Sequence, residues 1–343
     1  MEERIMHAIK YLSSLKWWLF SVIFTVVAFC STAVKAETTE ARSPETILSE
    51  AGDVPNDDAV LELFRNASSW DAKHVDVRYP SQDALVELGA DYLEPVLKHY
   101  LSSTDIRRRI TLNTVVNLIG PPAAVPLIPY TRSENTVERS NAFALLGAVS
   151  AAARQEKPET VGPFDEDADI SKTLAEALTT ESDEEVLRTM LTSAGRLRDP
   201  SWVSRIKPYL DHSSEPVRLH AVIGLSFIPH SNAATALMKA LDDSMGSVRQ
   251  AAVFALSEPF MCHLYYDNLI YALKNTEPGH RRQLLMLDVL TRYFKTIQDS
   301  EESVSETQVE AAINLYNLLI PKSEGNDIFR YYLARMKTAV SHW

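Results

Sequence analysis

The chain has 343 residues, of which 45% are hydrophobic and only 10 are glycine, a composition that favours helices over turn-rich sheets. Its 46 acidic residues outnumber the 34 basic residues and give a net charge of −12. Such a surface repels phosphate backbones, so the composition predicts no nucleic-acid partner.

The first 36 residues have the layout of a secretory signal peptide. A basic stretch at 4–16 precedes an uncharged apolar run at 17–34, and small residues flank Lys35 before a polar segment. We therefore predict an exported, periplasmic or extracellular chain with a signal peptide at 1–36. The alternative is a single uncleaved N-terminal membrane anchor, because the apolar run is long enough to cross a bilayer.

Cleavage of this segment changes the cysteine count and the net charge. Cys30 is removed, so Cys262 remains as the only thiol and no intrachain disulfide can form. The segment carries four basic and two acidic residues, so the mature chain has a net charge of −14. We expect a basic or neutral protein partner, with binding that weakens as salt increases. A membrane is a partner only if the segment is retained.

Residues 37–58 are rich in acidic side chains and are predicted to form a linker. Within it, Ser43 and Pro44 are typical of the start of a short helix. Residues 59–300 are predicted to hold a repeat array, and residues 301–343 to form a C-terminal helical cap. Two helices are expected in the cap, near 306–320 and 326–340.

The array is indicated by a repeated phrase. "EPVRLHAVIGL" begins at Glu215 and "GSVRQAAVFAL" begins at Gly246, 31 residues later. The corresponding anchor residues are Val217 and Val248. Stepping back by the same interval reaches Val186, and the same interval also separates two further apolar residues, Ile106 and Val137.

Each anchor is predicted to open a helix. Apolar residues follow four and eight positions later, as Ala221 and Leu225 do after Val217. Ala252 and Leu256 stand at the same distances from Val248. Capping residues precede the anchors, at Thr104–Asp105, Asn135–Thr136, Ser182–Asp183 and Ser214–Glu215.

A second helical segment follows in every unit. A helical pair of this length buries its apolar faces only by stacking on neighbouring pairs. The sequence therefore predicts an all-α, right-handed α-solenoid, a HEAT-like or armadillo-type superhelix. We expect about six or seven helical pairs.

The two phrases resemble HEAT-like repeats of the short, Val-Arg-anchored type first noted in phycobilin lyases. The resemblance covers roughly residues 75–296. "ENTVERSNAFALL" departs from the pattern, because Glu138 stands in the Arg position and Asn141 in the Ala position. Such repeats occur in proteins of very different function, so the resemblance implies a fold rather than an activity.

In a stack of repeats, Arg218 lies above Arg249, and Asp211 above Asp242. A binding role for this charged column is one interpretation. We favour a structural role, in which loop carboxylates bond to arginines of adjacent helices.

An insertion interrupts the array around 155–169, within the unit that begins at Val137, and we predict that this acidic loop contacts the partner. Asp165, Asp167, Asp169 and Glu176 occupy positions 1, 3, 5 and 12 of a calcium-loop pattern. Ile170 stands where that loop needs glycine for a sharp turn. We therefore predict no metal, but an acidic loop that leads into a helix capped by Asp169 or Ser171.

Several other residues have the chemistry of a site but a simpler structural interpretation. His220 lies among apolar residues, which favours a hydrogen-bonded packing role over metal ligation. Cys262 adjoins a histidine, yet a buried, inert thiol is the prediction. Ser204 and Lys207 fit Ser-x-x-Lys, but the partner motifs of that nucleophile family are absent, and Lys207 is expected to face solvent.

Asn66 and Ser68 form a glycosylation sequon, which matters only in a eukaryotic source. The sequence thus predicts no catalytic, cofactor-binding or metal-binding residues. It predicts an exported, non-catalytic scaffold for protein–protein interaction in the cell envelope or outside the cell. One alternative, implied by the resemblance, is a bilin-lyase-like chromophore lyase or isomerase. Another is a signal-anchored structural envelope protein.

Overall fold

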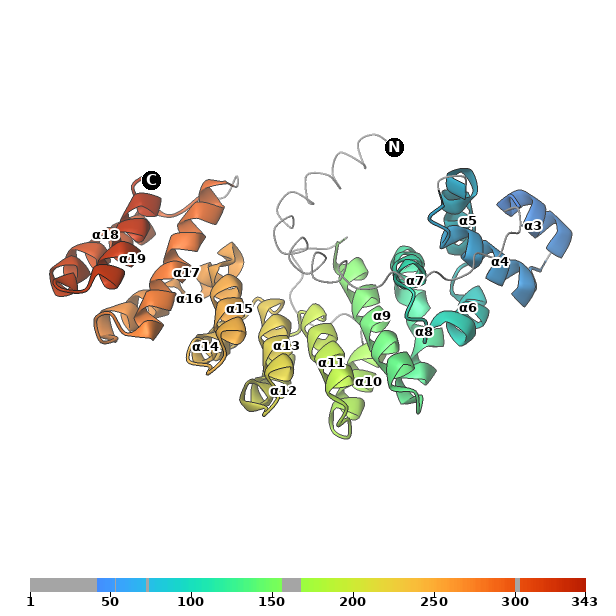
Figure 1. Ribbon diagram of the computed structural model, residues 1–343, viewed down its shortest axis with the longest axis horizontal. Coiled ribbons are helices and arrows are strands. Elements are labelled where there is room, and N and C mark those ends of the chain that lie inside the picture. Colours follow the sequence, from blue (N-terminus) through green and yellow to red (C-terminus); the bar gives the residue numbers. More distant parts are fainter. Residues whose placement is uncertain (1–41, 53, 72–73, 156–167, 300–302) are drawn as a thin grey trace. The chain divides into compact units, whose positions relative to one another are not determined.

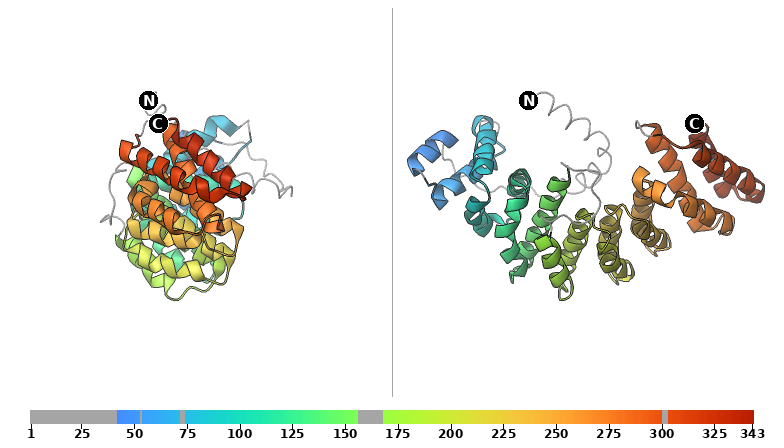
Figure 2. Two further views of the ribbon diagram at one scale, coloured as in Figure 1. Left: turned by 90° about the vertical axis from the view of Figure 1, so that its left-hand side faces the viewer. Right: turned by 180° about the vertical axis from the view of Figure 1, so that it is seen from behind.

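Helices alone make up the regular structure of the part of the chain that the computed structural model describes, residues 42–343 apart from 53, 72–73, 156–167 and 300–302. The predicted signal peptide at 1–36 and most of the predicted acidic loop lie outside the described residues. Within Arg42–Trp343 the helices follow one another in chain order, as Figures 1 and 2 show.

The helices alternate between two layers. We call one the odd layer: α5 Val75–Leu88, α7 Ile106–Ile119, α9 Thr136–Gln155, α11 Glu184–Arg196, α13 Glu215–Ser226, α15 Gly246–Ser257, α17 Arg281–Gln298 and α19 Asp327–Val340. The even layer holds α4 Asp57–Ala67, α6 Leu93–Tyr100, α8 Ala124–Leu127, α10 Ala168–Leu178, α12 Trp202–Ile206, α14 Ser231–Ala240, α16 Pro259–Asn275 and α18 Glu306–Leu319. Each odd helix packs against the next odd helix, and most odd helices also pack against at least one even helix beside them. The described chain is therefore an all-α solenoid, as predicted.

Two even-layer helices are short and end in a tighter coil. α8 continues into the 3₁₀ helix η4 Ile128–Arg132, and α12 continues into η6 Lys207–Asp211. Pro129 and Pro208 stand at the second residue of these 3₁₀ segments. Proline has no amide hydrogen to complete the α-helical ladder, so the chain tightens there.

Three of the four predicted capping sites bond to the first turn of their helices, whereas Ser214 precedes α13 without a side-chain cap bond. Asp105 Oδ1 accepts a hydrogen bond from the Arg107 amide at 2.9 Å, and Asn135 Oδ1 accepts one from the Val137 amide at 2.9 Å. Asp183 Oδ1 accepts from two amides of α11, at 3.0 and 3.1 Å. These bonds satisfy amides that have no partner within the first turn.

Three of the five predicted anchors are core residues. Val186, Val217 and Val248 are each 0% exposed. Ala221, Leu225, Ala252 and Leu256, which follow the last two anchors, are also buried. This confirms the predicted helix faces of α11, α13 and α15.

The other two anchors are wrong, because Ile106 is 48% exposed and Val137 is 40% exposed. The buried pattern of α9 starts one residue later and uses Ala142 and Leu146, while that of α7 starts two residues later. The fixed interval of 31 residues therefore misplaced the register of both helices. In α9 it is Arg139, the fourth helical residue, that corresponds to Arg218 and Arg249.

Two glycines allow α11 and α13 to approach closely. A Cβ atom on Gly195 would lie 2.1 Å from the backbone oxygen of Gly224, and one on Gly224 would lie 2.4 Å from the backbone oxygen of Leu191. No side chain fits at these distances. The contact between these two helices therefore depends on glycine.

The predicted linker contains an ordered helix. α3 Pro44–Ala51 begins after Ser43, whose Oγ accepts from the Thr46 amide at 3.3 Å, and it packs against α4 and α5. Ile47 anchors it and is 2% exposed. Pro44 is also buried, so the short helix expected at Ser43 and Pro44 packs on the stack instead of lying in a free linker.

The last two helices lie close to their expected bounds. α18 packs against α16 in the even layer, and α19 packs against α17 in the odd layer. A capping box between Ser305 and Gln308 begins α18. The predicted cap therefore continues both layers of the stack.

Candidate functional site

The arginine column belongs to the structure of the loops. Arg218 Nη1 donates to the backbone oxygens of His212 and Ser213, each at 3.0 Å. Its Nε and Nη2 donate to Asp243 at 2.7 and 3.1 Å. Although burial opposes it, these bonds and one from the Met245 amide lower the pKa of the Asp243 carboxyl. The Arg218 guanidinium thus bonds both to the loop before α13 and to the loop before α15.

Arg139 repeats this arrangement in α9. Its Nη1 donates to the backbone oxygens of Ser133 and Glu134 at 2.8 and 3.0 Å, and its Nε donates to Glu181 at 3.0 Å. Arg249 makes only the backbone contacts: its Nη1 donates to the backbone oxygens of Asp243 and Ser244 at 2.7 and 2.8 Å. The favoured structural role therefore agrees with the geometry.

The carboxylates of the column are not the two that the sequence indicated. Asp211 pairs with Lys239 Nζ at 2.6 Å, and Asp242 pairs with Arg282. Asp243 is the residue that reaches Arg218. In the second loop Asp242 faces α17 while the adjacent Asp243 faces α13, which a count of residues does not reveal.

The calcium-like pattern is only partly within the described residues. Asp165 and Asp167 lie outside them. Asp169 is in the first turn of α10, and Glu176 lies 3.5 Å from Arg132. No group of three metal-ligating side chains occurs among the described residues.

The predicted cap of α10 is wrong, because the helix already begins at Ala168 and contains both Asp169 and Ser171. Ser171 Oγ instead accepts a hydrogen bond from the Trp202 indole at 3.1 Å. That bond joins α10 to α12.

His220 and Cys262 have structural surroundings. His220 Nδ1 lies 3.0 Å from Thr192 Oγ1, and burial together with the nearby Arg188 charge lowers the pKa of His220 to about 4. Cys262 is 2% exposed, and burial raises the pKa of its thiol. A neutral imidazole and a protonated thiol follow at neutral pH.

Two further motifs have structural surroundings, and only the sequon is buried. Ser204 Oγ donates to the Ser201 backbone oxygen at 3.0 Å, and Lys207 is exposed, as predicted. Asn66 is 8% exposed and donates to the Arg42 backbone oxygen at 3.0 Å. Its amide is therefore engaged in packing rather than presented for glycosylation.

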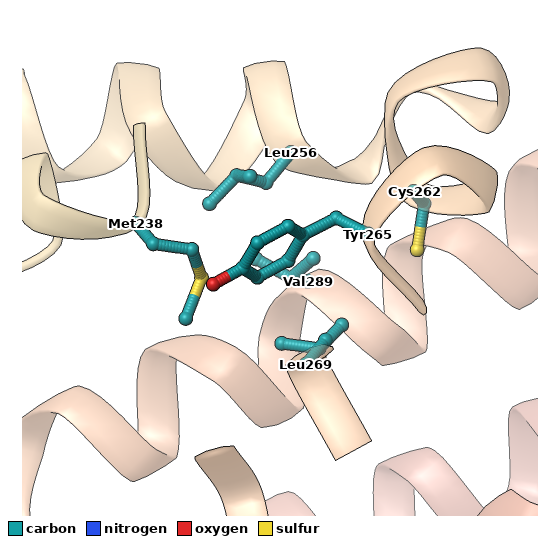
Figure 3. A pocket seen from close by; sticks show the side chains of 6 residues that line it. All are labelled: Met238, Leu256, Cys262, Tyr265, Leu269 and Val289. Atoms are coloured by element: carbon teal, nitrogen blue, oxygen red, sulfur yellow. The ribbon is translucent and has the colours of Figure 1, made fainter. Parts of the chain in front are cut away.

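A small apolar recess, too narrow to hold even a water molecule, lies among α14, α15, α16 and α17. It is lined by Met238, Leu256, Cys262, Tyr265, Leu269 and Val289. Figure 3 shows the Tyr265 ring beside Met238, Leu256 and Val289, with Leu269 below. A small ligand needs a pocket of roughly 300 Å³ or more, whereas this recess has no room for a water molecule, so it is a packing feature.

Four large apolar side chains are exposed on two neighbouring odd-layer helices. Val75 and Tyr79 of α5 are 42% and 55% exposed, and Ile106 and Ile110 of α7 are 48% and 42% exposed. Each pair is separated by four residues and so lies along one face of its helix. We call these four residues the N-terminal apolar patch.

Sequence reasoning missed this patch because it assigned Ile106 and Ile110 to the core. A signal was present: Leu112, Val115 and Val116 form a second apolar face on α7, and that face is buried.

None of the described helices combines the length and the hydrophobicity that are needed to cross a bilayer.

Comparisons with known proteins agree with the repeat architecture. A family model described as HEAT repeats matches residues 171–257, whereas no curated protein sequence matches the chain. Among solved structures, E. coli YibA has 18% identity and a TM-score of 0.41, over 76% of this chain and 96% of that chain.

Two other solved structures are similar at comparable levels. Kap121p has 16% identity and a TM-score of 0.44, over 87% of this chain and 33% of that chain. The CpcE–CpcF complex of phycocyanin lyase from Nostoc sp. PCC7120 has 16% identity and a TM-score of 0.35, over 85% and 100%. The family match covers residues 171–257, from within α10 to the end of α15, and shows that this part of the all-α solenoid is similar to HEAT repeats.

Proposed function

We propose that this chain is an exported, non-catalytic scaffold that mediates protein–protein interaction in the cell envelope or outside the cell. The observation that carries the proposal is the extended two-layer stack, which exposes large apolar side chains on neighbouring helices. An extended helical surface suits a protein partner, whereas a small substrate needs a concave pocket.

Charge gives the proposal a direction. After loss of the signal peptide the chain carries a net charge of −14. Such a chain attracts basic or neutral partners more strongly than acidic ones, and salt screens the attraction.

The insertion adds a further contact for the same partner, outside the described surfaces. α9 ends at Gln155 and α10 begins at Ala168, so the insertion joins the two layers within one unit. Residues 156–167 lie outside the described residues, and their partner contact is a proposal from the sequence alone.

Export rests on the layout of residues 1–36. Sequencing the amino terminus of the native protein tests it: a start at Glu37 supports export and cleavage, and a retained Met1 supports the anchored alternative. The chromophore-lyase alternative is tested by an absorbance titration of the purified protein with a tetrapyrrole. A saturable change in the visible spectrum would favour that alternative.

The partner-binding role is tested by cross-linking in the native cell, followed by affinity capture. Ile106→Asp with Ile110→Asp places two charges in the N-terminal apolar patch, and we expect it to reduce capture of the cross-linked protein. Val125→Asp is the matched control, because Val125 is 73% exposed on α8 in the even layer. If no protein is cross-linked, or if the control loses capture equally, this function is wrong.

A further inference from the structure

Two arginines from neighbouring odd-layer helices converge on one buried carboxylate near the C-terminal end of the stack. Arg292 Nε of α17 donates to Asp288 Oδ2 at 2.9 Å, and Arg335 Nη1 of α19 lies 3.1 Å from Asp288 Oδ1. The Asp288 side chain is 11% exposed, whereas the two arginine side chains are 33% and 31% exposed. We call these three residues the arginine cluster.

Aromatic rings support both guanidinium groups. Arg292 Cζ lies 4.4 Å from the ring centroid of Phe254 on α15. Arg335 Cζ lies 5.7 Å from the rings of both Tyr331 and Tyr332. These cation–π contacts hold the guanidinium groups without using their hydrogen-bond donors.

The cluster has more N–H donors than Asp288 can accept from, and more positive charge than Asp288 can neutralise. Two guanidinium groups carry ten N–H donors, and one carboxylate neutralises only one of the two charges. Asp288 Oδ1 makes no hydrogen bond, because the approach of Arg335 lacks hydrogen-bond geometry. The cluster thus keeps a local charge of about +1 and unused, partly exposed donors on a strongly acidic chain.

We propose that the arginine cluster binds a carboxylate of the partner protein. A planar guanidinium matches a carboxylate through two parallel hydrogen bonds, and aromatic backing fixes its plane. Tyr331 is 59% exposed beside Arg335 and offers an apolar surface to the neighbouring residue of the partner. A carboxylate within an otherwise neutral or basic segment fits both this site and the net charge of the chain.

This inference rests on the proposed scaffold function and names a second contact surface for it, at the opposite end of the described stack from the N-terminal apolar patch. It predicts recognition of a carboxylate by purified protein. Its failure would leave the cross-linking result on the partner untouched. Absence of any cross-linked protein would instead remove the scaffold function.

The test uses the mature protein and three short peptides, followed by NMR of the arginine Nε signals. The peptides are N-acetyl-Leu-Glu-Leu-amide, its Gln counterpart, and N-acetyl-Leu-Leu-Leu with a free terminal carboxylate. We expect saturable shifts of the Arg292 and Arg335 signals with at least one carboxylate peptide and none with the Gln peptide. The responding peptide shows whether a side chain or a chain terminus supplies the carboxylate.

Variants distinguish binding by the arginine cluster from attraction to positive charge in general. We expect Arg292→Ala or Arg335→Ala to weaken peptide binding by about tenfold or more, since charge-assisted hydrogen bonds are lost. Arg330→Ala is the matched control on the same helix: Arg330 is 53% exposed and lies 3.9 Å from Asp327, outside the cluster. We expect it to bind like the unaltered protein.

If an alanine variant loses helix content, Arg292→Lys and Arg335→Lys replace it, because they keep the charge beside Asp288 but lose the planar fork. We expect these variants to bind several-fold more weakly. Equal binding by the lysine variants, equal loss in Arg330→Ala, or equal shifts with the Gln peptide would overturn the proposal.

Discussion

Single side chains hold consecutive loops of the stack together, and Arg218 is the strongest example. It is 11% exposed, and its partner Asp243 is 7% exposed. Arg249 has the same position in the next helix but reaches only two backbone oxygens. A comparison of variants at these two arginines therefore separates the stability contributed by the backbone contacts from that contributed by the carboxylate contact.

We expect Arg218→Ala to lower the free energy of unfolding by about 2–4 kcal/mol, because it leaves Asp243 largely buried without its cation. Arg249→Ala is the matched variant, and we expect a loss of about 1 kcal/mol. Urea denaturation of both variants measures the difference. Equal losses would mean that the contact with Asp243 adds nothing.

His220 predicts a pH dependence. Its pKa of about 4 in the folded chain lies below the ordinary histidine value of 6.5, so the folded state favours the neutral imidazole. This stability is fully present above pH 6.5 and is lost as the pH falls toward 4, by at most about 3 kcal/mol. We expect His220→Gln, which cannot titrate, to flatten the unfolding free energy across this window. A curve as steep as that of the unaltered protein would assign the pH dependence to other groups.

At the scale of the helix, the sequence predicted where helices begin better than it predicted which of their faces are buried. Capping residues such as Asp105 and Asp183 bond to amides a few residues away, so their pattern is local. The face of a helix depends on what packs against it, and the apolar residues of α7 offered two faces. The arginine cluster was beyond sequence reasoning for the same reason, since Phe254, Asp288 and Arg335 meet only after α15, α17 and α19 stack.

The register correction predicts opposite effects for two substitutions that the repeat pattern treats alike. Ala221 is 0% exposed and Ile110 is 42% exposed. We expect Ala221→Asp to unfold the neighbouring units, because it buries a charge, and Ile110→Asp to change the melting temperature little. Circular dichroism melts check both variants. A large drop in the melting temperature of Ile110→Asp would support the sequence-based assignment of Ile110 to the buried face.

The contact between α11 and α13 predicts a strict requirement for glycine. We expect Gly195→Ala to cost about 1–3 kcal/mol or more, since its Cβ would meet the Gly224 backbone at 2.1 Å. Gly246→Ala is the control, because its Cβ would meet only the Arg249 guanidinium, at 3.6 Å. Denaturation midpoints compare the two. A Gly195→Ala variant as stable as the control would show that the helices can separate without cost.

At the scale of the whole described stack, stability is a sum over neighbouring helices, because each helix packs on helices close to it in the chain. Removing residues 303–343 deletes α18 and α19 and uncovers the sides of α16 and α17 on which they pack. Three large residues near the end of α17, Tyr293, Phe294 and Ile297, are each 0% exposed in the intact stack. Uncovered apolar surface favours association, so we expect the truncated chain to form oligomers.

The same truncation shows how far the units depend on one another. We expect hydrogen exchange to accelerate in α15, α16 and α17 and to stay unchanged in α5 and α7, because no direct contact links the deleted helices to the N-terminal ones. Mass spectrometry of peptic fragments resolves the two regions, and α4 serves as an internal reference. Uniform acceleration along the chain would mean that the described helices unfold as one cooperative body, since additive units lose protection only beside the cut.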